Sequence, residues 1–292
     1  MGYDLTFRSR GSGAAPPIED LHEYFEQRPN FRIDGFTAQY LNEDTGIYFS
    51  FDMGGDFPMF QLNYARSHVF ALEAVDEVRS FMQHFDQIVD DPRIDGMTGG
   101  EFSQDKFLAG FDTGNRTGYR MAADPSTGFE GWFTRPAAVI AAEWRWNFGR
   151  AAMQERVGES VFVPKISYFL MEGELRSGAV WSDAIPVAMP EVEYLVIVRD
   201  RSWPQRLLNR EPEILALPFA QLEPIAARYR FVPGELGHYQ MYWDKAPADV
   251  TDFLRNAAMN ETPFEAVSAD RILDEETMAD VCAVEGLHHK LK

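Results

Sequence analysis

Two β-rich runs between Phe36 and Phe51 constrain the fold of this chain more than any other pattern. They flank five turn-forming residues, Asn42–Gly46, whose composition is typical of a tight connection between antiparallel strands. We therefore predict a β-hairpin in which Phe49 and Phe51 lie on one face and Tyr48 lies on the other. One face must pack against another element, and we expect that element to be a long helix further along the chain.

The residues around the hairpin predict a small α+β unit. Alternating apolar residues predict a strand over Tyr3–Phe7, and Pro58–Ala65 supplies a further strand. Apolar residues recur at spacings of three and four over Ile18–Gln27 and again over Val69–Val89, which predicts two helices. The order strand, helix, three strands, helix is typical of an antiparallel sheet with helices on one face.

The second half of the chain predicts a similar unit. Residues 86–131 are irregular and rich in Gly and Asp, with a short helix expected over Gln104–Phe111, and a helix with two tryptophans follows over Ala137–Arg156. Later we expect strands at 161–163, 166–171, 179–181, 192–198, 238–243 and 263–267, and helices at 219–229 and 248–258. The predicted class is α+β, with two similar-sized units whose sheets are mainly antiparallel. The predicted divisions are 1–95, a connector with its helix over 96–158, and 159–292.

The net charge of −19 limits the kinds of partner. Residues 1–150 hold 13 basic and 23 acidic side chains, and residues 151–292 hold 14 and 23, so the acidity is spread over the whole chain. No segment concentrates Lys or Arg, so we expect no nucleic-acid partner. An acidic surface attracts a basic protein, although the same surface also keeps a protein in solution.

Other features indicate the cytoplasm and no membrane contact. The N-terminus has neither the basic nor the apolar region of a secretory signal, and no stretch is apolar enough to span a bilayer. Cys282 is the only cysteine, which excludes an internal disulfide. We interpret it as a small packed side chain.

The sequence lacks the motifs of the common enzyme classes. Phosphate-binding glycine loops and the G-x-S-x-G nucleophile motif are absent. The pair His22 and Glu26 has no second histidine for a metal, so we expect neither a metal nor a cofactor. His68 and His238 lie at the ends of predicted elements, where either is a candidate general base.

Aromatic and acidic residues coincide at the hairpin. We take as candidate partner-binding residues Tyr40, Glu43, Asp44, Tyr48, Asp52 and Asp56. Rigid aromatic anchors with a polar rim are typical of protein interfaces. Our first hypothesis is an immunity-type module that neutralises a basic toxin or enzyme. The alternative is a hydrolase-type enzyme that uses His68 or His238, and a third is a structural subunit of a larger assembly.

Overall fold

The computed structural model describes residues 2–11, 15–90, 97, 100–124, 131–199, 213–257 and 264–285. Its contacts divide the chain into two compact units, one formed by residues 1–140 with 269–292 and the other by residues 141–268. These boundaries differ from the divisions we predicted after residues 95 and 158. The predicted connector is divided between the two units, and the C-terminal residues return to the first unit.

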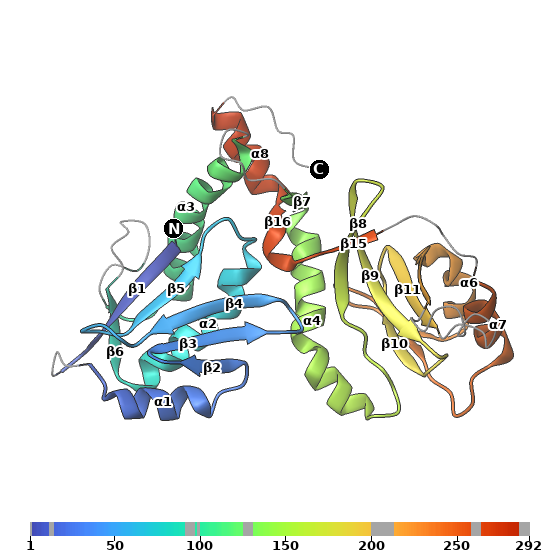
Figure 1. The fold of residues 1–292 in the computed structure, drawn as a ribbon, viewed down its shortest axis with the longest axis horizontal. Coiled ribbons are helices and arrows are strands. Elements are labelled where there is room, and N and C mark those ends of the chain that lie inside the picture. Colours follow the sequence, from blue (N-terminus) through green and yellow to red (C-terminus); the bar gives the residue numbers. More distant parts are fainter. Residues whose placement is uncertain are drawn as a thin grey trace. The chain divides into compact units, whose positions relative to one another are not determined.

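The first unit contains a six-stranded antiparallel sheet (Figure 1). Its strands, in spatial order, are β2 (Phe31–Asp34), β3 (Thr37–Asn42), β4 (Ile47–Asp52), β5 (Met59–Asn63), β1 (Gly2–Ser9) and β6 (Gln87–Asp90). The predicted hairpin is confirmed as β3 and β4, which pair from Thr37 opposite Asp52 to Asn42 opposite Ile47. The predicted strand at Tyr3–Phe7 lies within β1, and the one predicted over Pro58–Ala65 contains β5 and extends beyond it at both ends.

Three helices pack on one face of this sheet. They are α1 (Ile18–Glu26), α2 (Val69–His84) and α3 (Gln104–Ala123). Phe7 and Phe51 of the sheet contact Phe81 of α2, with ring centroids 4.9 and 5.0 Å apart, and Phe60 contacts Phe107 of α3 at 5.8 Å. The aromatic face of the hairpin is therefore the core of this unit, and the other face of the sheet bears the polar side chains.

Two elements differ from the prediction for physical reasons. The helix expected over Val69–Val89 ends at His84, because Asp86 adopts a left-handed conformation (φ 47°) and the chain enters β6. The short helix expected over Gln104–Phe111 continues to Ala123. Its glycines do not break it, since Gly118 permits close approach of the Ala65 backbone: a Cβ there would lie 2.4 Å from the Ala65 nitrogen.

The C-terminal segment completes the first unit. Strand β16 (Ile272–Asp274) pairs in parallel with β7 (Phe133–Arg135), and α8 (Glu275–Glu285) follows directly. Met278, Val281 and Cys282 are buried against Tyr119 and Ala122 of α3. This agrees with the interpretation of Cys282 as a packed side chain; burial also raises the pKa of its thiol.

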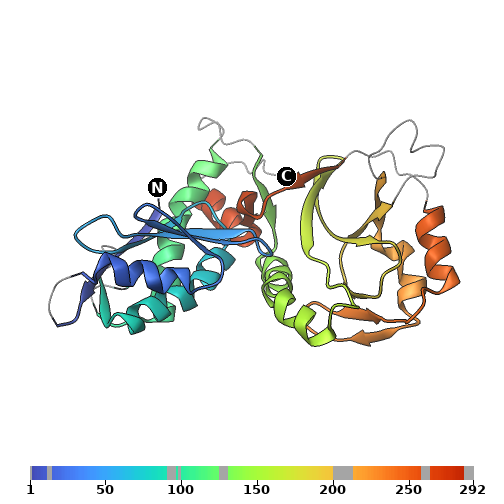
Figure 2. The ribbon, with the colours of Figure 1, turned by 60° about the horizontal axis from the view of Figure 1, so that its bottom comes forward.

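The described residues of the second unit form two sheets. Helix α4 (Ala137–Val157) enters it, and one sheet has the order β12 (Glu213–Pro218), β11 (Tyr194–Arg199), β9 (Glu174–Ser182), β8 (Ile166–Met171) and β15 (Phe264–Val267). The other has the order β10 (Val187–Pro190), β14 (His238–Met241) and β13 (Arg230–Val232). Side chains of both sheets and of α7 (Ala248–Asn256) form one core. Figure 2 shows the ribbon of this unit from a second direction.

Two predictions in the second unit need correction. The helix expected over 219–229 is a 3-10 turn, Phe219–Gln221, followed by the short helix α6 (Glu223–Ala226). Val161–Val163 is not a strand, although Phe162 forms one isolated bridge with Val187. The mainly antiparallel sheets with their helices confirm the α+β class. None of the helices among the described residues is long and apolar enough to cross a membrane.

Candidate functional site

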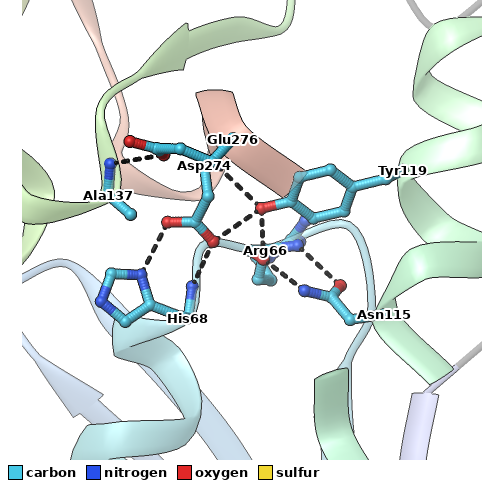
Figure 3. A network of polar contacts seen from close by, with 7 residues as sticks. All are labelled: Arg66, His68, Asn115, Tyr119, Ala137, Asp274 and Glu276. Carbon is cyan, nitrogen blue, oxygen red and sulfur yellow. Dashed lines mark hydrogen bonds and ion pairs between the residues drawn. The ribbon is translucent and has the colours of Figure 1, made fainter. Parts of the chain in front are cut away.

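His68 and Asp274 form the centre of a polar network in the first unit (Figure 3). His68 directly precedes α2, and Asp274 is the last residue of β16. Nδ1 of His68 lies 2.6 Å from Oδ1 of Asp274, and the backbone N–H of His68 donates to Oδ2 at 2.8 Å. Asp274 thus orients the imidazole ring and also caps the start of α2.

Tyr119 of α3 supports the same carboxylate. Its hydroxyl donates to Oδ2 of Asp274 at 2.9 Å and accepts from the Asp274 backbone N–H at 2.8 Å (Figure 3). Burial raises the pKa of Tyr119 well above its usual value, so the phenol remains a donor. Asn115, one turn earlier, accepts a hydrogen bond from the Arg66 backbone N–H and donates one to the Arg66 carbonyl oxygen. These two bonds fix the segment leading to His68.

Arg66 continues the network toward the sheet. Its guanidinium donates to the Tyr48 hydroxyl at 2.5 Å and lies 3.5 Å from the Asp270 carboxylate. The rings of Tyr48, Phe70 and Trp132 lie within 5.5 to 5.8 Å of the guanidinium carbon. Arg66 is therefore held by cation–π and ionic contacts inside the unit, and we assign it a structural role.

The network leaves one nitrogen of His68 available for chemistry. The side chain is 38% exposed, and Nε2 has no hydrogen-bond partner among the described residues. An imidazole held at Nδ1 by a carboxylate can accept a proton at Nε2, which is the geometry of a general base. The same contacts also fasten the C-terminal segment to α2, so they stabilise the fold as well.

His238, the other candidate base, is in a different setting. It lies in β14 of the second unit, half-buried, with its ring 5.5 Å from the ring of Trp146. Burial and nearby Arg156 lower the pKa of His238. Among the described residues, no carboxylate is hydrogen-bonded to His238, so the structure does not give it the orienting partner that His68 has.

A second candidate site is the polar face of the six-stranded sheet. A groove of about 730 Å³ crosses it, lined by side chains that include Asp4, Gln39, Ser50 and Gln61. A second groove of about 530 Å³ adjoins it and is lined in part by Arg32, Glu43 and Asp44. Both grooves include Gln39 and Leu41, and Leu41 is 50% exposed between them.

The predicted partner-binding residues fall into different places. Glu43 and Asp44 line the second groove and Tyr48 lines the first. Asp52 and Asp56 line neither groove; Asp52 accepts a hydrogen bond from the Gly54 backbone.

Tyr40 requires a correction, because the residue is only 4% exposed. It pairs with Phe49 across the hairpin, so its side chain lies on the core face, where the two rings stack 4.3 Å apart. Tyr40 therefore borders the first groove, but its buried side chain is not available to a partner.

Glu73 of α2 explains why the hairpin turn is well fixed. This carboxylate is 4% exposed, and its Oε1 accepts hydrogen bonds from Tyr40 at 2.9 Å, Asn42 at 2.9 Å and Thr45 at 3.1 Å. Burial, followed by the charge of Glu73, raises the pKa of Tyr40. No pattern in the sequence marked Glu73, because a glutamate on an amphipathic helix is ordinarily solvated.

No cluster of three or more His, Cys, Asp or Glu that could hold a metal ion occurs in the described part of the chain. No protein-family model matches this sequence, and no curated protein or solved structure matches it. The geometry of the two sites is therefore the basis for the functional proposals below.

Proposed function

We propose that this protein is a binding module that docks a basic protein partner on the polar face of its six-stranded sheet. The observation that carries the proposal is the pair of adjoining grooves, whose charged lining residues are Asp4, Glu43 and Asp44 against one cation, Arg32. The exposed Leu41 between the grooves offers an apolar contact. An acidic rim around an apolar contact favours a partner that is basic and partly apolar.

The net charge of −19 adds long-range attraction for such a partner. We propose, more specifically, a neutraliser that covers the active site of a basic toxin or enzyme in the cytoplasm. Carboxylates suit this role because they carry the same charge as the phosphate groups that a nuclease-type cleft attracts. A toxin is proposed as the partner by analogy, because the carboxylates resemble a nuclease's substrate in charge.

The proposal predicts that binding depends steeply on salt. The Debye screening length falls from about 10 Å at 0.1 M salt to about 3 Å at 1 M. A basic protein captured from the native lysate by the immobilised chain at 0.1 M salt should therefore be released at 1 M. Mass spectrometry identifies it.

A matched pair of double variants distinguishes binding at the grooves from attraction by the overall charge. Asp4→Asn with Glu43→Gln should abolish capture, whereas Glu19→Gln with Glu26→Gln, which removes two exposed charges from α1, should retain it. Capture that is indifferent to salt, or lost equally in both variants, would contradict the proposal.

A second candidate function is hydrolysis, favoured by the 2.6 Å contact of His68 with Asp274. In this reaction Nε2 of His68 removes a proton from water as the water oxygen bonds to a carbonyl carbon. The leaving group then departs with the electrons of the broken bond and takes up a proton. Asp274 acts by positioning the ring.

This second function predicts histidine-dependent hydrolysis of an activated ester, for which p-nitrophenyl acetate is the probe. His68→Gln should lower the rate above that of buffer by about 100-fold, the size of a typical general-base contribution. The control is His84→Gln, at an exposed histidine of α2, and it should leave the rate unchanged. Equal rates for the wild type and His68→Gln would show that His68 is not a general base for hydrolysis of this ester.

A further inference from the structure

Four polar side chains form a straight row across the sheet's polar face. Gln39 lies opposite Ser50, Ser50 lies opposite Gln61, and Gln61 lies opposite Asp4. Adjacent strands are about 4.8 Å apart, so the row is roughly 14 Å long. All four residues line the larger groove. The row therefore presents a carboxylate, two amides and a hydroxyl at regular intervals along one surface.

The groups of this row are available to a ligand. Among the described residues, none of the four side chains has a hydrogen-bond or ion-pair partner, and Asp4 is exposed. No Lys or Arg in the described part of the chain lines the larger groove. Among the described cations, Arg32 lies opposite Gln39, at the far end of the row from Asp4. Arg8 pairs with Asp90 at 3.0 Å, and Arg66 is held by Asp270. At the Asp4 end of the row an anionic ligand would therefore meet a carboxylate.

We propose that this row binds the guanidinium group of an arginine presented by the partner, an inference that rests on the proposed function. A guanidinium has five N–H donors in one plane and needs several acceptors side by side. The Asp4 carboxylate supplies the charge, while the carbonyl oxygen of Gln61 and the hydroxyl of Ser50 supply neighbouring acceptors. Leu41 and Tyr48 line the same groove and can cover the apolar stem of the arginine.

The chemistry favours arginine over lysine. An ammonium is a compact point charge with three donors, so it uses the carboxylate and few of the neighbouring acceptors. The planar guanidinium of arginine can instead bind acceptors on two adjacent strands at once. The row should therefore discriminate between the two cations, which a diffuse acidic surface does not do.

The test is a titration of the isotope-labelled full chain with arginine amide, followed by NMR. Backbone amide signals of Asp4, Gln39, Ser50 and Gln61 should shift, and Asp4→Asn should weaken binding about tenfold, as expected for loss of one charge-assisted contact. The matched control Glu26→Gln, which removes an exposed charge from α1, should change the affinity less than twofold. Lysine amide should bind more weakly than arginine amide.

Several results would overturn the inference: shifts confined to other residues, equal binding of the two amides, or equal effects of Asp4→Asn and Glu26→Gln. The titration needs no partner, so its failure is distinguishable from failure of the proposed function. A basic partner that is captured while arginine amide does not bind the row would remove only this inference. A row that binds arginine amide in a chain that captures no partner would remove only the proposed function.

Discussion

Gly118→Ala is expected to destabilise the first unit by about 3 kcal/mol, at the upper end of typical overpacking costs. A Cβ at this position would lie 2.4 Å from the nitrogen and 3.0 Å from the Cα of Ala65. Both are backbone atoms, and Ala65 already has a left-handed conformation (φ 57°), so the segment has little freedom to move away. The loss should appear as a lower urea midpoint in the unfolding of this unit.

Gly149 provides the matched control for this substitution. It is also a helical glycine, in α4, but a Cβ there meets no atom within 4 Å. Gly149→Ala should therefore stabilise the protein by about 1 kcal/mol through helix propensity alone. A Gly118→Ala variant that unfolds at or above the wild-type midpoint would show that α3 does not pack against Ala65 as described.

Asp274→Ala is expected to cost about 4 kcal/mol of folding free energy. The side chain is 6% exposed and accepts from the His68 backbone and from Tyr119, besides its contact with the His68 ring. Removing it leaves buried donors without an acceptor, and each such donor costs about 1–3 kcal/mol. The C-terminal segment should also become susceptible to limited proteolysis, because Asp274 fastens β16 to the start of α2.

Glu276→Ala is the control for Asp274→Ala. Glu276 lies two residues further along and makes one exposed hydrogen bond, to the backbone N–H of Ala137 at 2.9 Å. Its loss should cost less than about 1 kcal/mol. Equal urea midpoints for Asp274→Ala and the wild type would mean that the polar network contributes nothing to stability.

The sequence predicted the parts of the fold that depend on local patterns. The hairpin has a turn between alternating apolar runs and was found with nearly correct bounds. Helix α2 has a regular apolar stripe, so its start was predicted correctly. The full length of α3 was missed because its glycines resemble helix breakers. Gly118 admits the backbone at Ala65 and Gly114 admits the side chain of Tyr64, and contacts with residues so distant in the sequence leave no local signal.

The candidate sites were predictable only in part, for the same reason. His68 stood out as a histidine between a strand and a helix, but Asp274 lies 206 residues away and joins it only through the parallel pairing of β16 with β7. The polar row depends on β1 pairing with β5, which are not neighbours in the chain. Tyr40 was misplaced because a tyrosine suits both a core and an interface.

Photo-crosslinking at Leu41 tests the central claim most directly, because Leu41 is exposed between the two grooves. A photo-reactive residue would replace Leu41 in one variant and Glu26 of α1 in another, and each would be irradiated with the captured basic protein at 0.1 M salt. We predict a crosslinked product from position 41 that disappears at 1 M salt, and none from position 26. A complex that crosslinks only from position 26 would contradict binding on the polar face of the sheet.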